Sequence, residues 1–230
     1  MKRSLEAEMM DVPGQPRQLL QDDLRNLRVI NRYLGNYSNI VTGFSEILGA
    51  RKADRFSLLD VGTGSGDVPV ELARWAHSHR IRAQITALEY EPISIEQAAV
   101  QTRGTAGISL LRADGAAPPF RSASFDYVLA SQLLHHFSEE QIVALLRTWA
   151  PIARRAIVIS DLVRHPLAYY GIRLLTAVFT RNTMTRVDAP LSVRRAYTMA
   201  EWREILRRAD VGPFVLRWAF PFRMLAIVNL

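Results

Sequence analysis

The 230-residue sequence contains no cysteine, which excludes disulfide bonds, thiolate zinc sites, iron–sulfur clusters and a cysteine nucleophile. Lysine is also scarce, since Lys2 and Lys52 are the only lysines among 29 basic residues. No apolar run approaches the roughly 20 residues that a membrane-spanning helix needs, because arginine or proline interrupts the two most apolar stretches, 167–180 and 211–228. The first residues are charged and lack an apolar core, so the sequence predicts a cytoplasmic protein without a signal peptide or a transmembrane segment.

The excess of basic residues makes nucleic acid the first partner to consider. The 29 basic residues against 22 acidic ones give a net charge of +7 at pH 7, and a basic surface can attract a polyanion. The arginines are scattered, however, and adjacent pairs of them occur only at 154–155, 194–195 and 207–208. Acidic residues are interleaved with them, a pattern typical of a solvated surface. The charge pattern therefore disfavours a nucleic-acid partner.

The hydrophobic periodicity predicts two helices, over 17–34 and 40–48, and then an alternation of strands and helices. The expected strands are 56–61, 84–89, 108–112, 125–130 and 156–160, and the expected helices between them are 68–78, 92–101 and 139–149. Strands that alternate with helices indicate a mostly parallel sheet with helices on both faces.

The alternation ends at Asp161. A helical stripe runs from Leu167 to Val178, and a polar, arginine-rich stretch follows it up to Arg195. Thr198 and Glu201 form a capping-box pattern that opens a helix ending near residue 209. The last two apolar runs, 214–218 and 223–228, are typical of an antiparallel hairpin. They bring the predicted sheet to seven strands.

Three alternating glycines, Gly62, Gly64 and Gly66, come directly after the first predicted strand. Such a loop lets backbone N–H groups approach a ligand closely. The dinucleotide-binding pattern needs a further glycine where this chain has Asp67, and the lysine of a phosphate-binding loop is also missing. Asp60 stands two residues before the first glycine, where its carboxylate would repel a pyrophosphate and attract a cation. The loop therefore favours a cationic ligand.

The segment from Asp60 to Gly66 resembles motif I of the class I S-adenosylmethionine-dependent methyltransferases. Glu89 ends the next strand, where that family places the acidic residue that holds both ribose hydroxyls. Asp114 follows the third strand, where the family has a residue that accepts from the adenine amino group. The runs APPF…SFDYV and SQLLHHF around the fourth strand resemble further family motifs, so the resemblance covers about residues 55–160 in family order.

The resemblance implies a Rossmann-like, doubly wound α/β fold with an antiparallel C-terminal hairpin, and S-adenosylmethionine as the cofactor, with S-adenosylhomocysteine as its product. It predicts one domain made of N-terminal helices (1–50), a cofactor-binding core (55–161), a helical lid insertion (162–196) and a C-terminal helix with the hairpin (197–230). The residues expected to bind the cofactor are Asp60, Gly62, Thr63, Gly64, Gly66, Glu89, Tyr90, Asp114, Gly115 and Ser131.

Catalysis by such an enzyme is mainly the positioning of donor and acceptor for an in-line displacement. A hydroxyl or acidic-carbon acceptor also needs a base, and a neutral imidazole suits that role at physiological pH. His135 and His136 follow the fourth strand, and Asp161 ends the fifth, at the edge where open α/β sheets bind ligands. We therefore predict a catalytic His135–Asp161 dyad, with His136 supporting the cofactor or its loop. In the alternative interpretation the histidines only pack near the cofactor and Asp161 is a plain strand end or helix cap.

The remaining histidines lack the spacing of metal ligands, so no metal site is expected. Apolar and aromatic residues in the pieces outside the motif block favour an aromatic or apolar acceptor. The N-terminal segment and the block 161–202 are similar to small bacterial methyltransferases of quinone and phenolic polyketide metabolism. The leading hypothesis is therefore O- or C-methylation of a small phenolic, quinoid or polyketide-like acceptor.

Two other functions stay open at this stage. A tRNA or rRNA methyltransferase would use the basic surface, but the chain has neither an Asn/Asp-Pro-Pro-Tyr motif nor an added RNA-binding module. A non-catalytic S-adenosylmethionine-binding or peripheral membrane protein would use the helix at 167–180 for transient membrane contact. The sequence leaves the choice between monomer and homodimer open.

Overall fold

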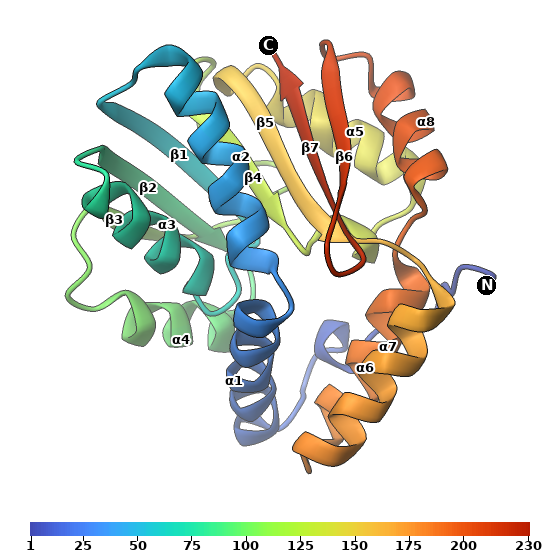
Figure 1. The fold of residues 1–230 in the computed structure, drawn as a ribbon. Coiled ribbons are helices and arrows are strands. Elements are labelled where there is room, and N and C mark those ends of the chain that lie inside the picture. Colours follow the sequence, from blue (N-terminus) through green and yellow to red (C-terminus); the bar gives the residue numbers. More distant parts are fainter.

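The computed structural model describes all residues from 1 to 230, and its centre is a seven-stranded sheet with the order β3-β2-β1-β4-β5-β7-β6 (Figure 1). The first five strands are parallel to one another. At one edge, β7 runs antiparallel to its two neighbours, β5 and β6. This is the predicted fold class. The strands are β1 (Arg55–Val61), β2 (Arg82–Glu89), β3 (Ile108–Arg112), β4 (Phe125–Ser131), β5 (Ala153–Leu162), β6 (Phe214–Ala219) and β7 (Arg223–Asn229).

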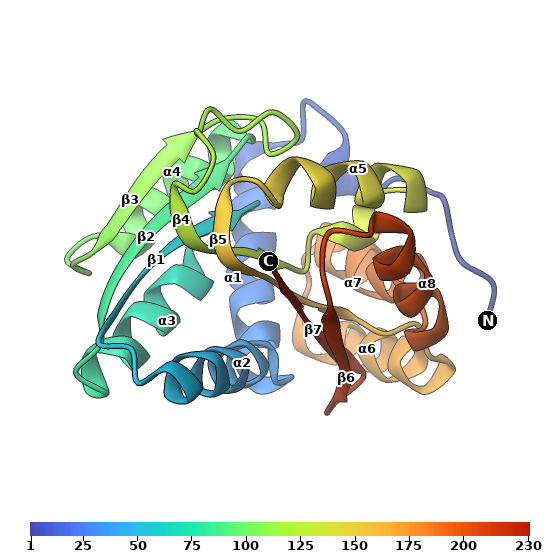
Figure 2. The ribbon, with the colours of Figure 1, turned by 90° about the horizontal axis from the view of Figure 1, so that it is seen from above.

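Helices cover both faces of this sheet, as Figure 2 shows from above. One core packs α2 and α3 against one face, and a larger core packs α5 and α8 against the other. The α-helices are α1 (Arg17–Tyr33), α2 (Asn36–Arg51), α3 (Asp67–Ser78), α4 (Pro92–Thr102), α5 (Glu139–Trp149), α6 (Pro166–Phe179), α7 (Thr183–Arg195) and α8 (Met199–Ala209), and the short 3₁₀ turns are η1 (Met9–Asp11) and η2 (Leu134–His136).

The chain reverses its direction of travel across the sheet between β1 and β4. From β1 it proceeds to β2 and β3 on one side, and it then returns to place β4 and β5 on the other. The connections that leave the carboxyl ends of β1 and β4 therefore diverge, and ligands of open α/β sheets bind in the crevice that this reversal creates. The glycine loop follows β1 and the histidine pair follows β4, so the topology brings both to this crevice.

Local sequence signals placed most elements correctly. The capping box of Ser138 and Gln141 opens α5, and that of Thr198 and Glu201 opens α8, both with their reciprocal hydrogen bonds. The helix predicted from residue 40 is longer, because α2 begins at Asn36.

The arginine-rich stretch after the first lid helix is the helix α7, which the periodicity did not predict. The amide side chain of Asn182 caps its first turn by accepting from the Thr185 N–H. The buried face of α7 includes Thr185, Asp188 and Arg195, and polar residues on a buried face hide the apolar stripe that normally reveals a helix.

The helices α6 and α7 contact each other and stand apart from the sheet, with α7 also contacting α1 (Figure 1). One face of α6 is exposed and apolar, with Leu167, Tyr170, Leu174, Val178 and Phe179 each more than 60% accessible. None of the helices combines the length and apolar character needed to cross a bilayer.

Candidate functional site

The glycine loop turns sharply between β1 and α3. Gly62, Gly64 and Gly66 all have positive φ, at +68°, +57° and +74°. At Gly62 a Cβ atom would also lie 2.7 Å from a methyl carbon of Leu133, so a side chain there would be both strained and crowded. The N–H groups of Gly62 and Thr63 donate to the Leu88 carbonyl, which ties the loop to the end of β2.

Two carboxylates border this loop. Asp60 is 1% exposed, and its Oδ2 accepts from the Thr63 hydroxyl at 2.6 Å. Burial raises the pKa of Asp60 to about 7, and the nearby charges of Asp67 and Glu89 add to that effect against the opposing Thr63 bond. Such clustered negative charge suits a cationic ligand.

Glu89 is fixed by three backbone N–H groups. Its Oε2 accepts from Gly64 at 2.7 Å, and its Oε1 accepts from Tyr90 at 2.9 Å and Glu91 at 3.0 Å. Burial raises the pKa of Glu89, and these three bonds offset part of the rise. The carboxylate is thus held in one orientation beside the loop.

Loop, carboxylates and histidines all line one cavity of about 1010 Å³. The predicted cofactor-binding residues in its wall are Asp60, Gly62, Thr63, Gly64, Glu89, Tyr90 and Ser131. Gly66, Asp114 and Gly115 lie outside that wall.

Each residue outside the wall has another contact in this structure. Gly66 lies close to Ala98 of α4, the exposed Asp114 accepts from the Ala116 N–H, and the Gly115 carbonyl accepts from Trp149. The cofactor-binding roles of all ten residues stay predictions.

His135 and Asp161 form a closely bonded pair at the ends of β4 and β5. The His135 Nδ1 lies 2.7 Å from the Asp161 Oδ1, and the His135 N–H donates to Oδ2 at 3.1 Å. The residues are 3% and 1% exposed. Burial acts to raise the pKa of Asp161, but His135 and the Leu162 N–H outweigh it and leave that pKa below its usual value. Because the Asp161 carboxylate can only accept, His135 Nδ1 carries a proton, and in the neutral tautomer the lone pair is on Nε2.

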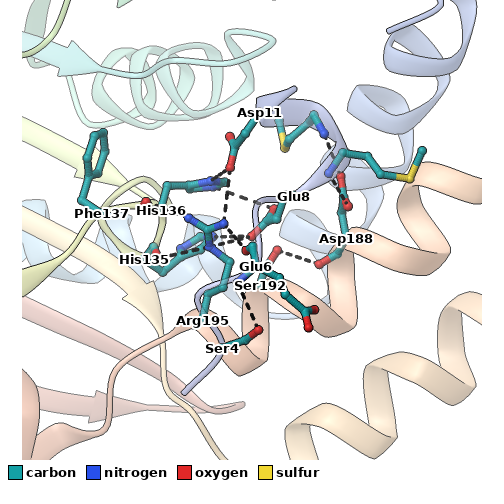
Figure 3. A network of polar contacts seen from close by, with 12 residues as sticks. Ser4, Glu6, Glu8, Asp11, His135, His136, Phe137, Asp188, Ser192 and Arg195 are labelled. Atoms are coloured by element: carbon teal, nitrogen blue, oxygen red, sulfur yellow. Dashed lines mark hydrogen bonds and ion pairs between the residues drawn. The ribbon is translucent and has the colours of Figure 1, made fainter. Parts of the chain in front are cut away.

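The N-terminal segment closes over His135 and His136, which the sequence did not predict (Figure 3). Glu8 is 1% exposed, and its Oε1 lies 3.7 Å from the His135 Nε2 while its Oε2 lies 4.0 Å from the His136 Nε2. Asp11 holds the other side of His136, with 2.8 Å between Oδ2 and Nδ1. Each imidazole therefore has one carboxylate at Nδ1 and shares Glu8 at Nε2.

Helix α7 holds this N-terminal segment in place. The Asp188 carboxylate accepts from the N–H groups of Met9 at 2.8 Å and Met10 at 3.0 Å. The buried Arg195 donates to the carbonyls of Glu6 and His136, and its Nε lies 3.7 Å from the Glu8 Oε1. Asp188 and Arg195, two of the polar residues that interrupt the apolar periodicity of α7, thus bind the N-terminal segment.

Glu8, His135 and His136 could also serve as metal ligands by geometry. One donor atom from each lies within 4.8 Å of the others, and two imidazoles with a carboxylate are a common ligand set for divalent metals. The Arg195 guanidinium beside Glu8 opposes a second cation there, since its charge would repel the ion. The absence of a metal stays a prediction.

Glu8 should make stability depend on pH. Burial raises its pKa from 4.5 to about 7, with Asp11 and Asp188 adding to the rise and His136 opposing it. The native state then keeps a proton at Glu8 that the unfolded state loses, so this contribution is full below about pH 4.5 and disappears as the pH rises through about 7.

Glu8→Gln should remove up to about 3 kcal/mol of the fall in unfolding free energy between pH 5 and pH 8, as measured by urea denaturation. Glu6→Gln, an exposed residue of the same segment, is the control and should follow the wild type. Parallel pH curves for wild type and Glu8→Gln would contradict the raised pKa of the buried Glu8 carboxyl.

The rest of the cavity wall is mostly apolar and comes from α1, α6, α7 and the end of β5. Its apolar members include Leu27, Ile30, Leu34, Leu162, Leu167, Ile172, Leu175 and Val193. The predicted lid helices therefore do face the cavity, with an apolar side.

A family model described as a methyltransferase domain matches residues 58–155, from β1 to the start of β5. Residues 58–155 form a class I methyltransferase domain. This confirms the family predicted from the glycine loop and, with it, S-adenosylmethionine as the cofactor of that family. No curated protein matches the sequence.

Several solved structures share the methyltransferase fold at low identity. Human N-acetylserotonin methyltransferase, in complex with S-adenosylmethionine, is 15% identical over 99% of this chain and 62% of its own, with a TM-score of 0.65. The plantazolicin methyltransferase BamL, in complex with a desmethyl-plantazolicin analog and S-adenosylhomocysteine, is 14% identical over 93% and 97%, with a TM-score of 0.67.

An O-methyltransferase family 2 protein from Planctomyces limnophilus, in complex with apigenin, is 19% identical over 76% of this chain and 49% of its own, with a TM-score of 0.55. The chain thus spans less than two thirds of the length of this protein and of the human enzyme. At identities this low, the similarity establishes a shared fold and nothing beyond it.

Proposed function

We propose that this protein transfers a methyl group from S-adenosylmethionine to an oxygen or acidic carbon of a small phenolic, quinoid or polyketide-like acceptor. The observation that carries the proposal is the single cavity of about 1010 Å³, which joins the glycine loop, His135 and the apolar walls of α1 and α6. Donor site, base and acceptor chamber would then be parts of one continuous cavity.

The cofactor end of the cavity fits the chemistry of S-adenosylmethionine. When bound, this cofactor supplies an electrophilic methyl group on a cationic sulfonium. Asp60 and Glu89 place two carboxyl groups at the loop, whose ionised forms a cationic ligand would favour, and the fixed carboxyl group of Glu89 can accept from ribose hydroxyls. The glycines with positive φ leave the loop without side chains at the positions where the ligand must approach the loop backbone.

At the other end, His135 would remove the acceptor proton. Its Nε2 carries the lone pair, and the ionised Asp161 both fixes the ring and stabilises the imidazolium that forms on proton uptake. His136, fixed by Asp11, would support the cofactor or its loop. The walls of α6 and α7 would act as the lid that excludes water from the acceptor.

The small-molecule class is favoured by the apolar chamber and by the complexes of similar folds. The similar structures include complexes with apigenin and with a plantazolicin analog. Labelled S-adenosylmethionine offered with a panel of phenols and quinols, and separately with total RNA, tests the class. We expect label in the small molecules, and label confined to RNA would contradict the proposal.

Glu89→Ala should weaken S-adenosylmethionine binding by about 10- to 100-fold, because a lost charged hydrogen bond costs about 1.5–3 kcal/mol. Isothermal titration calorimetry with S-adenosylhomocysteine measures the same effect without turnover. Glu96→Gln is the matched control, since Glu96 is an exposed carboxylate of α4 that pairs with Arg17 outside the cavity. Equal affinities for wild type and Glu89→Ala would place the cofactor elsewhere.

A further inference from the structure

Arg223, the first residue of β7, is a buried cation whose hydrogen bonding is incomplete. It is 1% exposed, its Nε donates to the Leu34 carbonyl at 2.6 Å, and its Nη1 has no hydrogen-bond partner. No carboxylate lies within 4 Å of it, whereas Arg195, the other buried arginine, pairs with Glu8 and Asp11. Burying an unpaired charge is costly, and such an arrangement is retained where a ligand completes it.

The guanidinium stays charged in this environment. Burial lowers the pKa of Arg223 to about 10, and the negative charge of Asp161 opposes part of that effect. The Asp161 carboxylate is itself occupied, because it accepts twice from His135 and once from Leu162. Arg223 therefore offers a full positive charge that this chain does not neutralise by direct pairing.

Arg223 also lies in the wall of the cavity, on the acceptor side. Leu34, Leu162 and Ile172 line the same cavity, so Arg223 adds a cation to a largely apolar part of its wall. The β5–β7 ladder pairs Arg223 with Leu162, and the adjoining Phe222 ring stacks on His165 at 4.8 Å. Both contacts fix the backbone from which the guanidinium projects, so the donors are held in place before a ligand arrives.

We infer that Arg223 is an anion-binding group of the acceptor pocket, and that the acceptor carries a carboxylate or similar anionic oxygen apart from the atom that is methylated. The inference rests on the proposed function, since it describes the acceptor of that reaction. A planar guanidinium matches a carboxylate with two parallel N–H donors, and the apolar wall around it accepts the remaining hydrocarbon.

A carboxylate could also come from the methionine part of the cofactor, and the sheet order argues against that source. The strands run β1-β4-β5-β7, so Arg223 starts three strands away from the glycine loop of β1. At about 4.8 Å per strand this separation is roughly 14 Å across the sheet. The acceptor side of the cavity is therefore the nearer one.

Two fluorescent probes that differ by one anionic group test the inference without turnover. They are 1-anilinonaphthalene-8-sulfonate and its neutral analogue N-phenyl-1-naphthylamine, titrated into the full chain. Arg223→Met should weaken binding of the sulfonate by about 10- to 100-fold, the effect of one charged hydrogen-bonding pair, and leave binding of the neutral probe unchanged. Arg173→Met, an exposed arginine of α6, is the control for binding to surface charge.

Affinity for S-adenosylhomocysteine, measured on the same variants, separates the two sources of the anion. Unchanged affinity together with weaker sulfonate binding supports the acceptor assignment. Weaker binding of S-adenosylhomocysteine by Arg223→Met would show that Arg223 binds the carboxylate of the cofactor, and would overturn the assignment. Unchanged affinity for both ligands would show that Arg223 binds no anion.

The thermal midpoint tests a structural role for Arg223. It should not fall in Arg223→Met, because methionine removes a buried charge, and a fall would show that the guanidinium stabilises the fold. If that variant does not fold, Arg223→Lys keeps the charge, loses the planar fork and should weaken sulfonate binding alone. Because these assays need no methyl transfer, a failure of the proposed function leaves their result interpretable.

Discussion

Replacing His135 with alanine is expected to lower kcat by about 10²- to 10⁴-fold while the affinity for S-adenosylhomocysteine stays within about twofold. The reason is positional, because His135 lines the cavity and its Nδ1 is committed to Asp161, which leaves Nε2, 3.7 Å from the Glu8 Oε1, as the nitrogen that can take a proton. The cofactor loop lies on a different strand connection and should be undisturbed. Initial rates with labelled S-adenosylmethionine and calorimetry with its product measure the two quantities separately.

Asp161→Asn sharpens this prediction, because an amide removes the negative charge that fixes the tautomer of His135. The two residues should act as one unit, so that the double variant loses no more activity than the worse single variant. His77→Ala, an exposed histidine of α3, is the control and should keep the wild-type rate. A His135→Ala protein with an unchanged rate would refute the general-base role, whereas additive losses would refute the dyad alone.

The second large effect concerns Trp149, which ends α5 and is 0% exposed in the larger core. Trp149→Ala should lower the free energy of unfolding by about 3–5 kcal/mol, because it leaves a cavity that the surrounding strands can only partly fill. Its Nε1 also donates to the Gly115 carbonyl at 2.8 Å, so the loop after β3 loses its anchor. Urea denaturation followed by circular dichroism measures the loss.

Trp149→Phe divides this effect into packing and hydrogen bonding. Phenylalanine keeps much of the ring volume but cannot donate to Gly115, so it should cost about 1 kcal/mol for the lost bond plus a smaller packing loss. Trp218→Ala on β6, where the side chain is half-exposed, is the control and should cost less than Trp149→Ala. Equal losses at the two tryptophans would show that burial in this core does not decide stability.

The elements that sequence alone located are those whose signals are local. A capping box spans four residues, and the apolar run of a buried strand predicts the strand by itself. The glycines of the loop all adopt positive φ within one turn. Helix α7 was not predicted, because its buried face includes polar residues. The partners that satisfy Asp188 and Arg195 are the N-terminal segment and the histidine loop, far away along the chain.

By itself, the sequence determined the strand–helix alternation, the position of the cofactor loop and the proximity of His135 to Asp161, because adjacent parallel strands bring their carboxyl ends together. Only the tertiary structure decided that Glu8 and Asp11 close over the histidine pair and that Arg223 is buried without a carboxylate. The first feature joins residues more than 100 positions apart, and the second depends on a missing contact. Neither produces a periodic pattern in the sequence. Burial makes an unmatched charge such as that of Arg223 costly, since water no longer satisfies it.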